Sequence, residues 1–143
     1  AEVAQKLVAS RVMIAGMDAW TDVEGPILKG LEVRHTPAAD IADTSQPILD
    51  WIAAEDISHL AVHFDLDVLD PAHFSPLLFN KPGVPVGTFD GIVQGRMRLE
   101  QVVRLLNDVG RAADIVGLAV TEFLPWDMLR LKNGLAALPI MKS

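Results

Sequence analysis

The sequence predicts an α/β fold built on a mainly parallel sheet. Segments with a strand pattern alternate along the chain with segments of helical period, an order typical of parallel sheets whose connections are helices. The chain has 143 residues, of which 50% are hydrophobic, so it has the size of one domain and enough apolar side chains for a sizeable core. We therefore expect a single domain over residues 1–143.

The first half of the chain contains two short strand candidates and two helices. Residues 12–17 form an apolar strand candidate, and a polar loop follows it. A short helix over residues 23–30 is expected to end at Gly30, and residues 31–35 form an edge-strand candidate. The next helix is expected to begin near Pro47, after a capping Thr or Ser, because proline is tolerated in the first turn of a helix.

The second half of the chain carries the clearest elements. Residues 59–66 are predicted to form the central strand, and residues 115–120 a second buried strand. Between them, residues 98–109 have apolar side chains at a helical period, with Gly110 placed to end the helix. Residues 74–94 are rich in Pro and Gly and show little periodicity, so we expect a long loop that helps to form the wall of a functional site.

The most informative stretch is residues 60–71, which read Leu-Ala-Val-His-Phe-Asp-Leu-Asp-Val-Leu-Asp-Pro. Alternate side chains of a strand share a face, so Asp65 and Asp67 project to the same side with Cα atoms about 6–7 Å apart. His63 lies on that face too. Two adjacent carboxylates repel each other unless a cation or a proton neutralises them, and a hard divalent metal is the natural partner. In open α/β sheets ligands bind at the carboxyl ends of the strands, which is where this pair is expected.

Other interpretations of the same residues are open. The pair can be a solvated acidic turn, with Asp70 in ordinary turn chemistry. A calcium loop of the EF-hand kind is excluded, because it needs an oxygen ligand at Leu69 and a Glu at Pro76. A phosphatase of the haloacid-dehalogenase type also begins with Asp-x-Asp after an apolar strand. Asp65 would then be the nucleophile and Asp67 the acid/base, although Leu69 stands where that family has Thr or Val. A non-catalytic interaction module is a third possibility.

Residues 63–71 resemble the signature of the ureohydrolases, the family of arginases, agmatinases and formiminoglutamases. That signature runs Ser-Phe-Asp-x-Asp-x-x-Asp-Pro, and only its first position differs here, where the chain has His. Residues 115–125 resemble the last core strand of the family, which ends in a Glu followed closely by Pro. Residues 95–100 lead into a helix where the family has a Gly-rich turn and its own helix, and residues 12–17 are similar to the strand before a substrate-side loop. The resemblance extends over residues 11–138 in the family's order.

The resemblance implies an arginase-like, three-layer α/β/α fold and a site with two manganese ions. Asp65 would bridge both ions and Asp67 would hold one of them. Glu122 would be the catalytic and substrate-binding carboxylate that accepts hydrogen bonds from a guanidinium group. Asp22 lies in the loop where family members contact the distal end of the substrate, and His63 is interpreted as a partner of the ligands. The implied reaction is hydrolysis of a guanidino or formimino C–N bond, as in arginine or agmatine, by hydroxide from a metal-activated water.

The family's other ligand motifs, Gly-Gly-Asp-His and Asp-Ala-His-x-Asp, do not occur in this sequence. The chain therefore resembles only the carboxyl-terminal half of a ureohydrolase, and we expect a partial domain with little or no turnover by itself. A truncated parallel sheet exposes apolar faces and an unpaired edge, so we expect a homo-oligomer.

The composition narrows the classes of function and partner that fit this sequence. A net charge of −7 argues against nucleic acid as a partner, since a protein that binds the phosphate backbone normally shows a basic patch. The chain has no cysteine, which removes disulfides and thiolate chemistry. We find no signal peptide or membrane span and expect a cytoplasmic protein that binds a small-molecule substrate.

Overall fold

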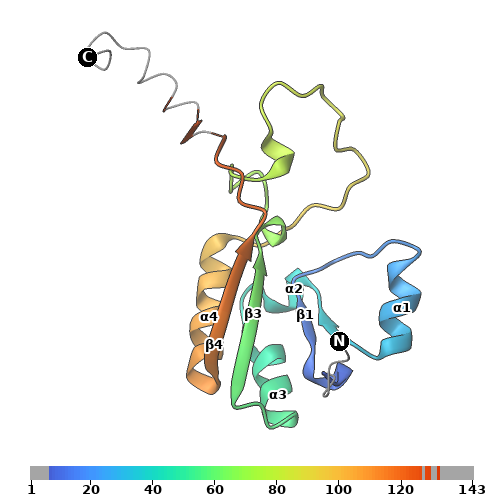
Figure 1. Ribbon diagram of the computed structural model, residues 1–143, viewed down its shortest axis with the longest axis vertical. Helices are drawn as coiled ribbons and strands as arrows, with labels where there is room; N and C mark the ends of the chain where they lie inside the picture. The colour runs from blue at the N-terminus through green and yellow to red at the C-terminus, as the bar shows by residue number, and fades with distance from the viewer. Residues whose placement is uncertain (1–6, 127, 130–131, 133–143) are drawn as a thin grey trace, which may run out of the picture.

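The computed structural model describes residues 7–126, 128–129 and 132 (Figure 1). Its helices and strands follow the predicted alternation. They are η1 (Ala9–Arg11), β1 (Met13–Ala15), α1 (Glu24–Leu31), β2 (Arg34–Thr36), α2 (Ala38–Ile41), α3 (Gln46–Ala54), β3 (His59–Asp65), η2 (Leu66–Val68), η3 (Leu78–Asn80), α4 (Leu99–Ala112) and β4 (Asp114–Thr121).

The strands of the described residues form two separate parallel pairs. β1 pairs with β2 in a register that places Ile14 opposite His35. β3 pairs with β4 from His59 opposite Asp114 to Asp65 opposite Thr121, with one irregularity beside Leu60. Figure 1 shows β3 and β4 side by side, with β1, β2 and α1 to one side of them. The sequence pattern predicts one parallel sheet, and here its strands are divided between two pairs that share no ladder.

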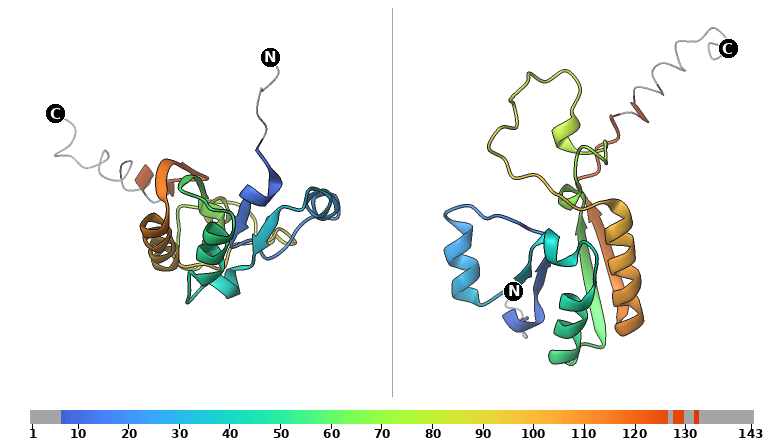
Figure 2. Two further views of the ribbon diagram at one scale, coloured as in Figure 1. Left: turned by 90° about the horizontal axis from the view of Figure 1, so that it is seen from below. Right: turned by 180° about the vertical axis from the view of Figure 1, so that it is seen from behind.

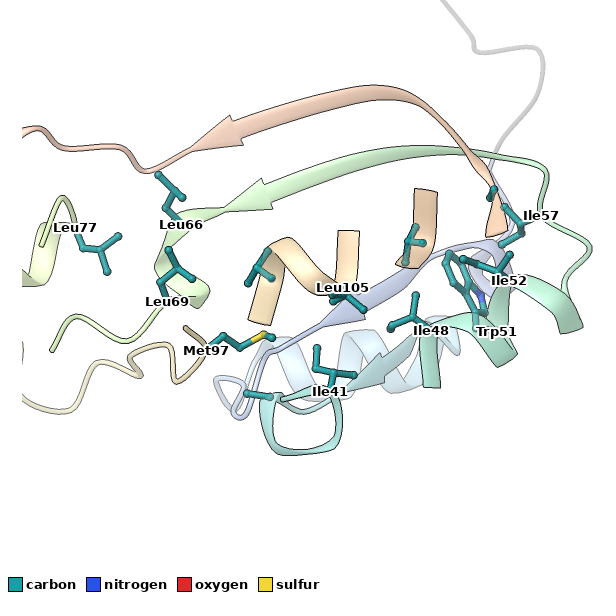
Figure 3. Packing of buried hydrophobic residues seen from close by; sticks show 14 residues of the cluster. Ile41, Ile48, Trp51, Ile52, Ile57, Leu66, Leu69, Leu77, Met97 and Leu105 are labelled. Carbon is teal, nitrogen blue, oxygen red and sulfur yellow. The ribbon is translucent and has the colours of Figure 1, made fainter. Parts of the chain in front are cut away.

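The hydrophobic core lies on one face of the β3–β4 pair, where α3 and α4 pack. Seen from below, both helices lie on the same side of the two strands (Figure 2). α4 buries a stripe at helical spacing, and α3 contributes Trp51, which is 5% exposed. Along β3 burial alternates, so that Leu60 and Phe64 contact the core while His63 is exposed. Figure 3 shows the packing of the cluster, whose buried members include Ile41, Ile48, Trp51, Ile52, Leu66, Leu69, Leu77, Met97, Val102, Leu105 and Val109.

Two predicted helix ends are wrong. Gly30 lies inside α1, which ends one residue later, and Glu32 then takes a left-handed conformation with φ 56°. Gly110 lies inside α4, which continues to Ala112. An ideal Cβ at Gly30 would meet no atom within 4 Å, and one at Gly110 only the tip of Ile115. Both glycines are therefore tolerated as ordinary helix residues, and neither supplies the reversal that a terminating glycine provides.

One arginine fastens α4 to the segment after α2. The guanidinium of Arg104 donates hydrogen bonds to the carbonyl oxygens of Ile41 and Ala42, each at 2.6 Å. These carbonyls lie at the carboxyl end of a one-turn helix, where a backbone acceptor has no partner within the helix. One turn further along α4, Asp108 accepts a 2.6 Å hydrogen bond from the Ser45 hydroxyl. Both contacts fix α4 against the segment between α2 and α3.

The long loop after the acidic motif closes on itself. Leu69 and Met97 form an isolated parallel bridge, with Asp70 N donating to Met97 O at 2.8 Å and Met97 N donating to Val68 O at 3.1 Å. The residues between Leu69 and Met97 therefore form a loop whose two ends are joined by backbone hydrogen bonds. In the middle of this loop, the rings of Phe79 and Phe89 pack edge to face with their centroids 5.6 Å apart.

Within the described part of the chain the longest helix, α4, has 14 residues, and no helix can cross a membrane.

Candidate functional site

The acidic pair lies at the carboxyl end of β3, as predicted, but the prediction that Asp65 and Asp67 share a strand face by alternation is wrong, because the strand ends before Asp67. β3 ends at Asp65, and the chain then turns through η2, which contains Asp67. The Oδ1 atom of Asp65 accepts the backbone N–H of Asp67 at 2.9 Å and so caps this turn. The strand thus stops at its own carboxylate, and the two acidic side chains stay next to each other.

Asp67 is the electrostatically unusual member of the pair. Its Oδ1 atom is buried, and within the described residues it has no hydrogen-bond partner. Burial raises the pKa of the Asp67 carboxyl above its ordinary value of 3.8, and the negative charges of Asp65 and Glu122 raise it further. A buried carboxylate oxygen without a donor is costly, and a bound cation removes that cost.

Glu122 joins the pair from the neighbouring strand. Thr121 ends β4 opposite Asp65, so Glu122 follows at the same end of the strand pair. Its negative charge helps to raise the pKa of Asp67, so Glu122 lies close enough to interact electrostatically with the acidic pair. Glu122 has φ 60°, a left-handed conformation that costs a residue with a side chain about 1–2 kcal/mol. Nothing in the sequence pattern predicts this strained backbone, and strain of this kind is concentrated at functional sites.

The segment after Glu122 is tied to the loop that follows the acidic motif. Leu124 N donates to Pro76 O at 2.9 Å, and the indole Nε1 of Trp126 donates to Leu77 O at 2.7 Å. Leu77 is fully buried. These bonds hold the two segments that leave the acidic cluster, one from β3 and one from β4, against each other.

Two glycines contact the turn that carries Asp67. Gly16, just after β1, has φ +87°, and a Cβ placed on it would lie 2.6 Å from Val68 Cγ2. A Cβ on Gly95 would overlap the backbone of Asp67 and Val68. Only glycine allows this approach of three chain segments. The sequence pattern predicts that Gly95 lies in a turn before a helix, but no signal in the sequence indicates that it lies against the acidic motif.

His63 is on the exposed face of β3, the face that Asp65 also shares by alternation along the strand. Its Nε2 atom lies 3.0 Å from the Thr121 hydroxyl, in hydrogen-bonding distance across the two strands. The imidazole is therefore held beside the acidic cluster. Its interpretation as a partner of metal ligands stays a prediction.

Asp22 lies elsewhere, and two other ionisable side chains, Asp18 and His73, have partners of their own. Asp22 is exposed in the turn before α1, and no contact joins it to the acidic cluster in the described structure. Asp18 accepts a 2.9 Å hydrogen bond from Ala38 N and lies 3.6 Å from Arg96. His73 is paired with Asp70, its Nδ1 atom 2.8 Å from Oδ2. Hydrogen bonds from the Ala72 N–H and, to a smaller extent, from His73 lower the pKa of Asp70, because they stabilise its charged form.

The donor set fits part of a divalent-metal site. Carboxylate oxygens are suitable ligands for manganese, and Asp67 presents an oxygen that lacks a donor. Within residues 7–126, 128–129 and 132 no group of three or more His, Cys, Asp or Glu side chains is arranged to hold a metal ion. Asp65 and Asp67 can thus contribute two ligands, and a complete site needs others from outside the described residues.

The fold has been observed in solved enzymes. The chain is similar to Helicobacter pylori arginase (TM-score 0.63, 17% identity), covering 85% of this chain and 38% of that one. It is also similar to a hypothetical agmatinase from Burkholderia thailandensis (TM-score 0.55, 21% identity), covering 82% of this chain and 32% of that one. No family model matches, and no curated relative matches in sequence. The chain therefore has an arginase-like α/β fold with parallel strands, and it corresponds to only about a third of the length of these two structures.

Proposed function

We propose that this chain is the carboxyl-terminal part of a manganese-dependent ureohydrolase that cleaves a guanidino or formimino C–N bond. The observation that carries the proposal is the cluster of Asp65, Asp67 and Glu122, in which Asp67 has a buried oxygen without a donor. The cluster lies at the carboxyl ends of adjacent parallel strands, the usual place for ligands in α/β sheets.

Each carboxylate has a separate task in the proposal. Asp65, whose Oδ1 is fixed by the Asp67 N–H, and Asp67 would hold manganese. Glu122 would accept hydrogen bonds from the guanidinium or amidine group of the substrate, for which a carboxylate has the matching charge and geometry. Its exposed side chain is accessible to a solute, and the left-handed backbone sets the direction in which it leaves β4. Bound manganese would supply a water of lowered pKa as the nucleophile.

Metal binding by this chain is the first test. We expect isothermal titration with MnCl₂ to show weak binding that Asp65→Asn and Asp67→Asn both reduce at least about tenfold, equal to about 1.4 kcal/mol. Asp70→Asn is the matched control, because Asp70 is only three residues further on but is satisfied by Ala72 and His73. Equal binding by all four proteins would contradict the assignment of the metal ligands.

Activity has to be measured on a longer polypeptide that completes the site. With manganese, we expect urea from arginine, agmatine or guanidinobutyrate, or formamide from formiminoglutamate, and we expect Glu122→Gln to abolish turnover while manganese binding persists. This chain alone should show little or no turnover, because two carboxylates do not complete a two-metal site.

A phosphate ester, assayed with magnesium, tests the phosphatase alternative in parallel. Phosphate release that depends on Asp65 would reject the ureohydrolase proposal in favour of a phosphatase. Manganese binding without turnover of any of these compounds by the longer polypeptide would favour the non-catalytic module.

A further inference from the structure

Arg96 carries an available positive charge close to the acidic pair. Its side chain is 78% exposed, and its one ion-pair contact among the described residues joins Nε to the Asp18 Oδ2 atom at 3.6 Å. That distance is too long for a hydrogen bond. In the part of the chain that the structure describes, the two Nη groups of Arg96 donate to no acceptor, so they are available to bind one from outside.

The backbone around Arg96 is fixed beside Asp67. Gly95 lies so close that a Cβ on it would overlap the backbone of Asp67 and Val68. On the other side of Arg96, Met97 N donates to Val68 O at 3.1 Å. Consecutive Cα atoms are about 3.8 Å apart, so the Arg96 Cα atom lies within about 8 Å of the Asp67 backbone oxygen. The base of this side chain is therefore held near the acidic pair, while its guanidinium is exposed.

Asp18 connects the Arg96 guanidinium with the groove that contains the acidic pair. Asp18, Asp65 and Asp67 all line a groove between β1 and β3, at the carboxyl ends of these strands. The Ala38 N–H donates to Asp18 Oδ1 at 2.9 Å, which fixes that carboxylate. Arg96 contacts Asp18 and does not line the groove itself. The groove therefore has carboxylates in its wall and a cation at its edge.

We propose that Arg96 binds a carboxylate at the distal end of the substrate, so that the complete enzyme prefers guanidino or formimino acids to amines such as agmatine. The inference rests on the proposed function, in which the guanidino or amidine end of the substrate meets Glu122. A guanidinium can donate two parallel hydrogen bonds to a carboxylate, and the Nη groups of Arg96 can supply them. The charge of Arg96 would instead repel a distal ammonium group.

Guanidinobutyrate and agmatine are the substrates that test this inference. Both have a guanidino group on carbon chains of equal length, and they differ in the charge at the other end. With manganese and the longer polypeptide that completes the site, we expect kcat/KM to be at least about tenfold higher for guanidinobutyrate. Arg96→Gln should reduce this ratio at least about fivefold, mainly through the KM for guanidinobutyrate, because the contact is made in the ground state as well. Arg96→Glu should reverse the preference.

Arg98→Gln is the matched control. It removes the same charge two residues further along the chain, but the Arg98 guanidinium lies 3.4 Å from His73 Nε2 and does not line the groove. The substrate ratio should therefore stay within about twofold of the wild type, since a nearby charge in solvent is screened. An equal loss of preference in the Arg96 and Arg98 variants would overturn the proposal, because it would show a general effect of charge instead of a contact.

A binding measurement without manganese separates this inference from the reaction. Isothermal titration of the metal-free longer polypeptide gives the affinity for each compound without turnover. Arg96→Gln should shift the affinity ratio at least about fivefold toward agmatine, whichever compound binds more tightly. An unchanged ratio would overturn the role of Arg96.

The two kinds of failure are distinguishable. Turnover of both compounds with a ratio that Arg96→Gln leaves unchanged would overturn the inference and keep the ureohydrolase proposal. No turnover of either compound with manganese would count against the ureohydrolase proposal, and the metal-free titration would then decide by itself whether Arg96 binds a carboxylate.

Discussion

The backbone N–H of Asp67 donates a 2.9 Å hydrogen bond to the Oδ1 atom of Asp65. This bond satisfies one carboxylate of the pair and leaves the other, whose Oδ1 is buried, without a donor among the described residues. Two side chains that look equivalent in the sequence are therefore chemically different. Asp65 is held in place by the backbone, and Asp67 carries the unfavourable charge.

The charge of Asp67 should make the metal-free chain less stable as the pH rises. Its folded-state pKa is raised above 3.8, so between the ordinary and the raised value the folded state holds a proton that the unfolded state has lost. Stability falls through that interval, and the full penalty remains above it. Asp67→Asn removes the buried charge and its repulsion from Asp65 and Glu122, and should raise the free energy of unfolding at neutral pH by up to about 0.5 kcal/mol, because solvent reduces both effects. Below pH 3.8 the gain should vanish in urea unfolding curves.

Asp70 should have the opposite effect on the pH dependence of the free energy of unfolding. The Ala72 N–H and His73 lower its pKa, so its contribution to stability is present above the ordinary value and is lost as the pH falls through the lowered one. Asp70→Asn should therefore destabilise the chain at neutral pH and have less effect in acid. The same sign of change for both variants at neutral pH would contradict the electrostatic difference between the two carboxylates.

Removing the side chain of Glu122 should stabilise the fold. Gly adopts φ 60° without a steric penalty, so Glu122→Gly should raise the free energy of unfolding by about 0.5–1 kcal/mol after the entropy cost of glycine. Glu32→Gly, at φ 56° after α1, is the control for the backbone effect alone. If only the Glu32 variant is stabilised, the Glu122 side chain makes a favourable contact that offsets its strain.

Gly95 should tolerate no side chain. A Cβ would overlap the backbone of Asp67 and Val68, which cannot rotate away, so Gly95→Ala should cost about 2–3 kcal/mol of stability. Faster amide exchange at Asp67 and Val68 should accompany the loss. Gly30→Ala, inside α1 with open space around it, should instead add about 0.5–1 kcal/mol. A Gly95 variant with wild-type thermal stability would show that the three segments do not meet as described.

Arg104 should contribute more to stability than the exposed Arg111 on the same helix. Arg104→Met keeps the aliphatic contacts but leaves the carbonyl oxygens of Ile41 and Ala42 without their donor, a loss of about 2–3 kcal/mol. Arg111→Met on the same helix should change stability by less than about 0.5 kcal/mol, because that side chain is 76% exposed. Chemical denaturation of both variants gives the comparison, and similar small losses would show that Arg104 acts only as a surface charge.

The sequence predicts the location of the acidic pair well because a local pattern determines it. An apolar strand that stops at Asp65 carries its carboxylates to the edge of a sheet whatever the rest of the chain does. The helix over residues 98–109 was likewise found close to its predicted bounds, as α4, since its apolar stripe repeats at a helical period.

The features that the sequence does not predict depend on contacts between distant segments. The division of the strands into two pairs depends on which strand edges meet, and strand periodicity carries no information on that. The contact of Gly95 with Val68, the strained backbone of Glu122 and the bonds from Arg104 to residues more than 60 positions away also require tertiary structure. The helix ends predicted at Gly30 and Gly110 are wrong because glycine marks a helix terminus only where a left-handed residue is needed.

The bridge between Leu69 and Met97 separates the geometry of the acidic cluster from the course of the residues between them. Backbone bonds set both ends of that segment, so insertions or deletions near its tip leave the carboxylates where they are. The segment between Leu69 and Met97 can therefore vary in length independently of the acidic cluster. Changes of length there would alter the surface beside Asp65 and Asp67 and leave the backbone that carries these two residues unchanged.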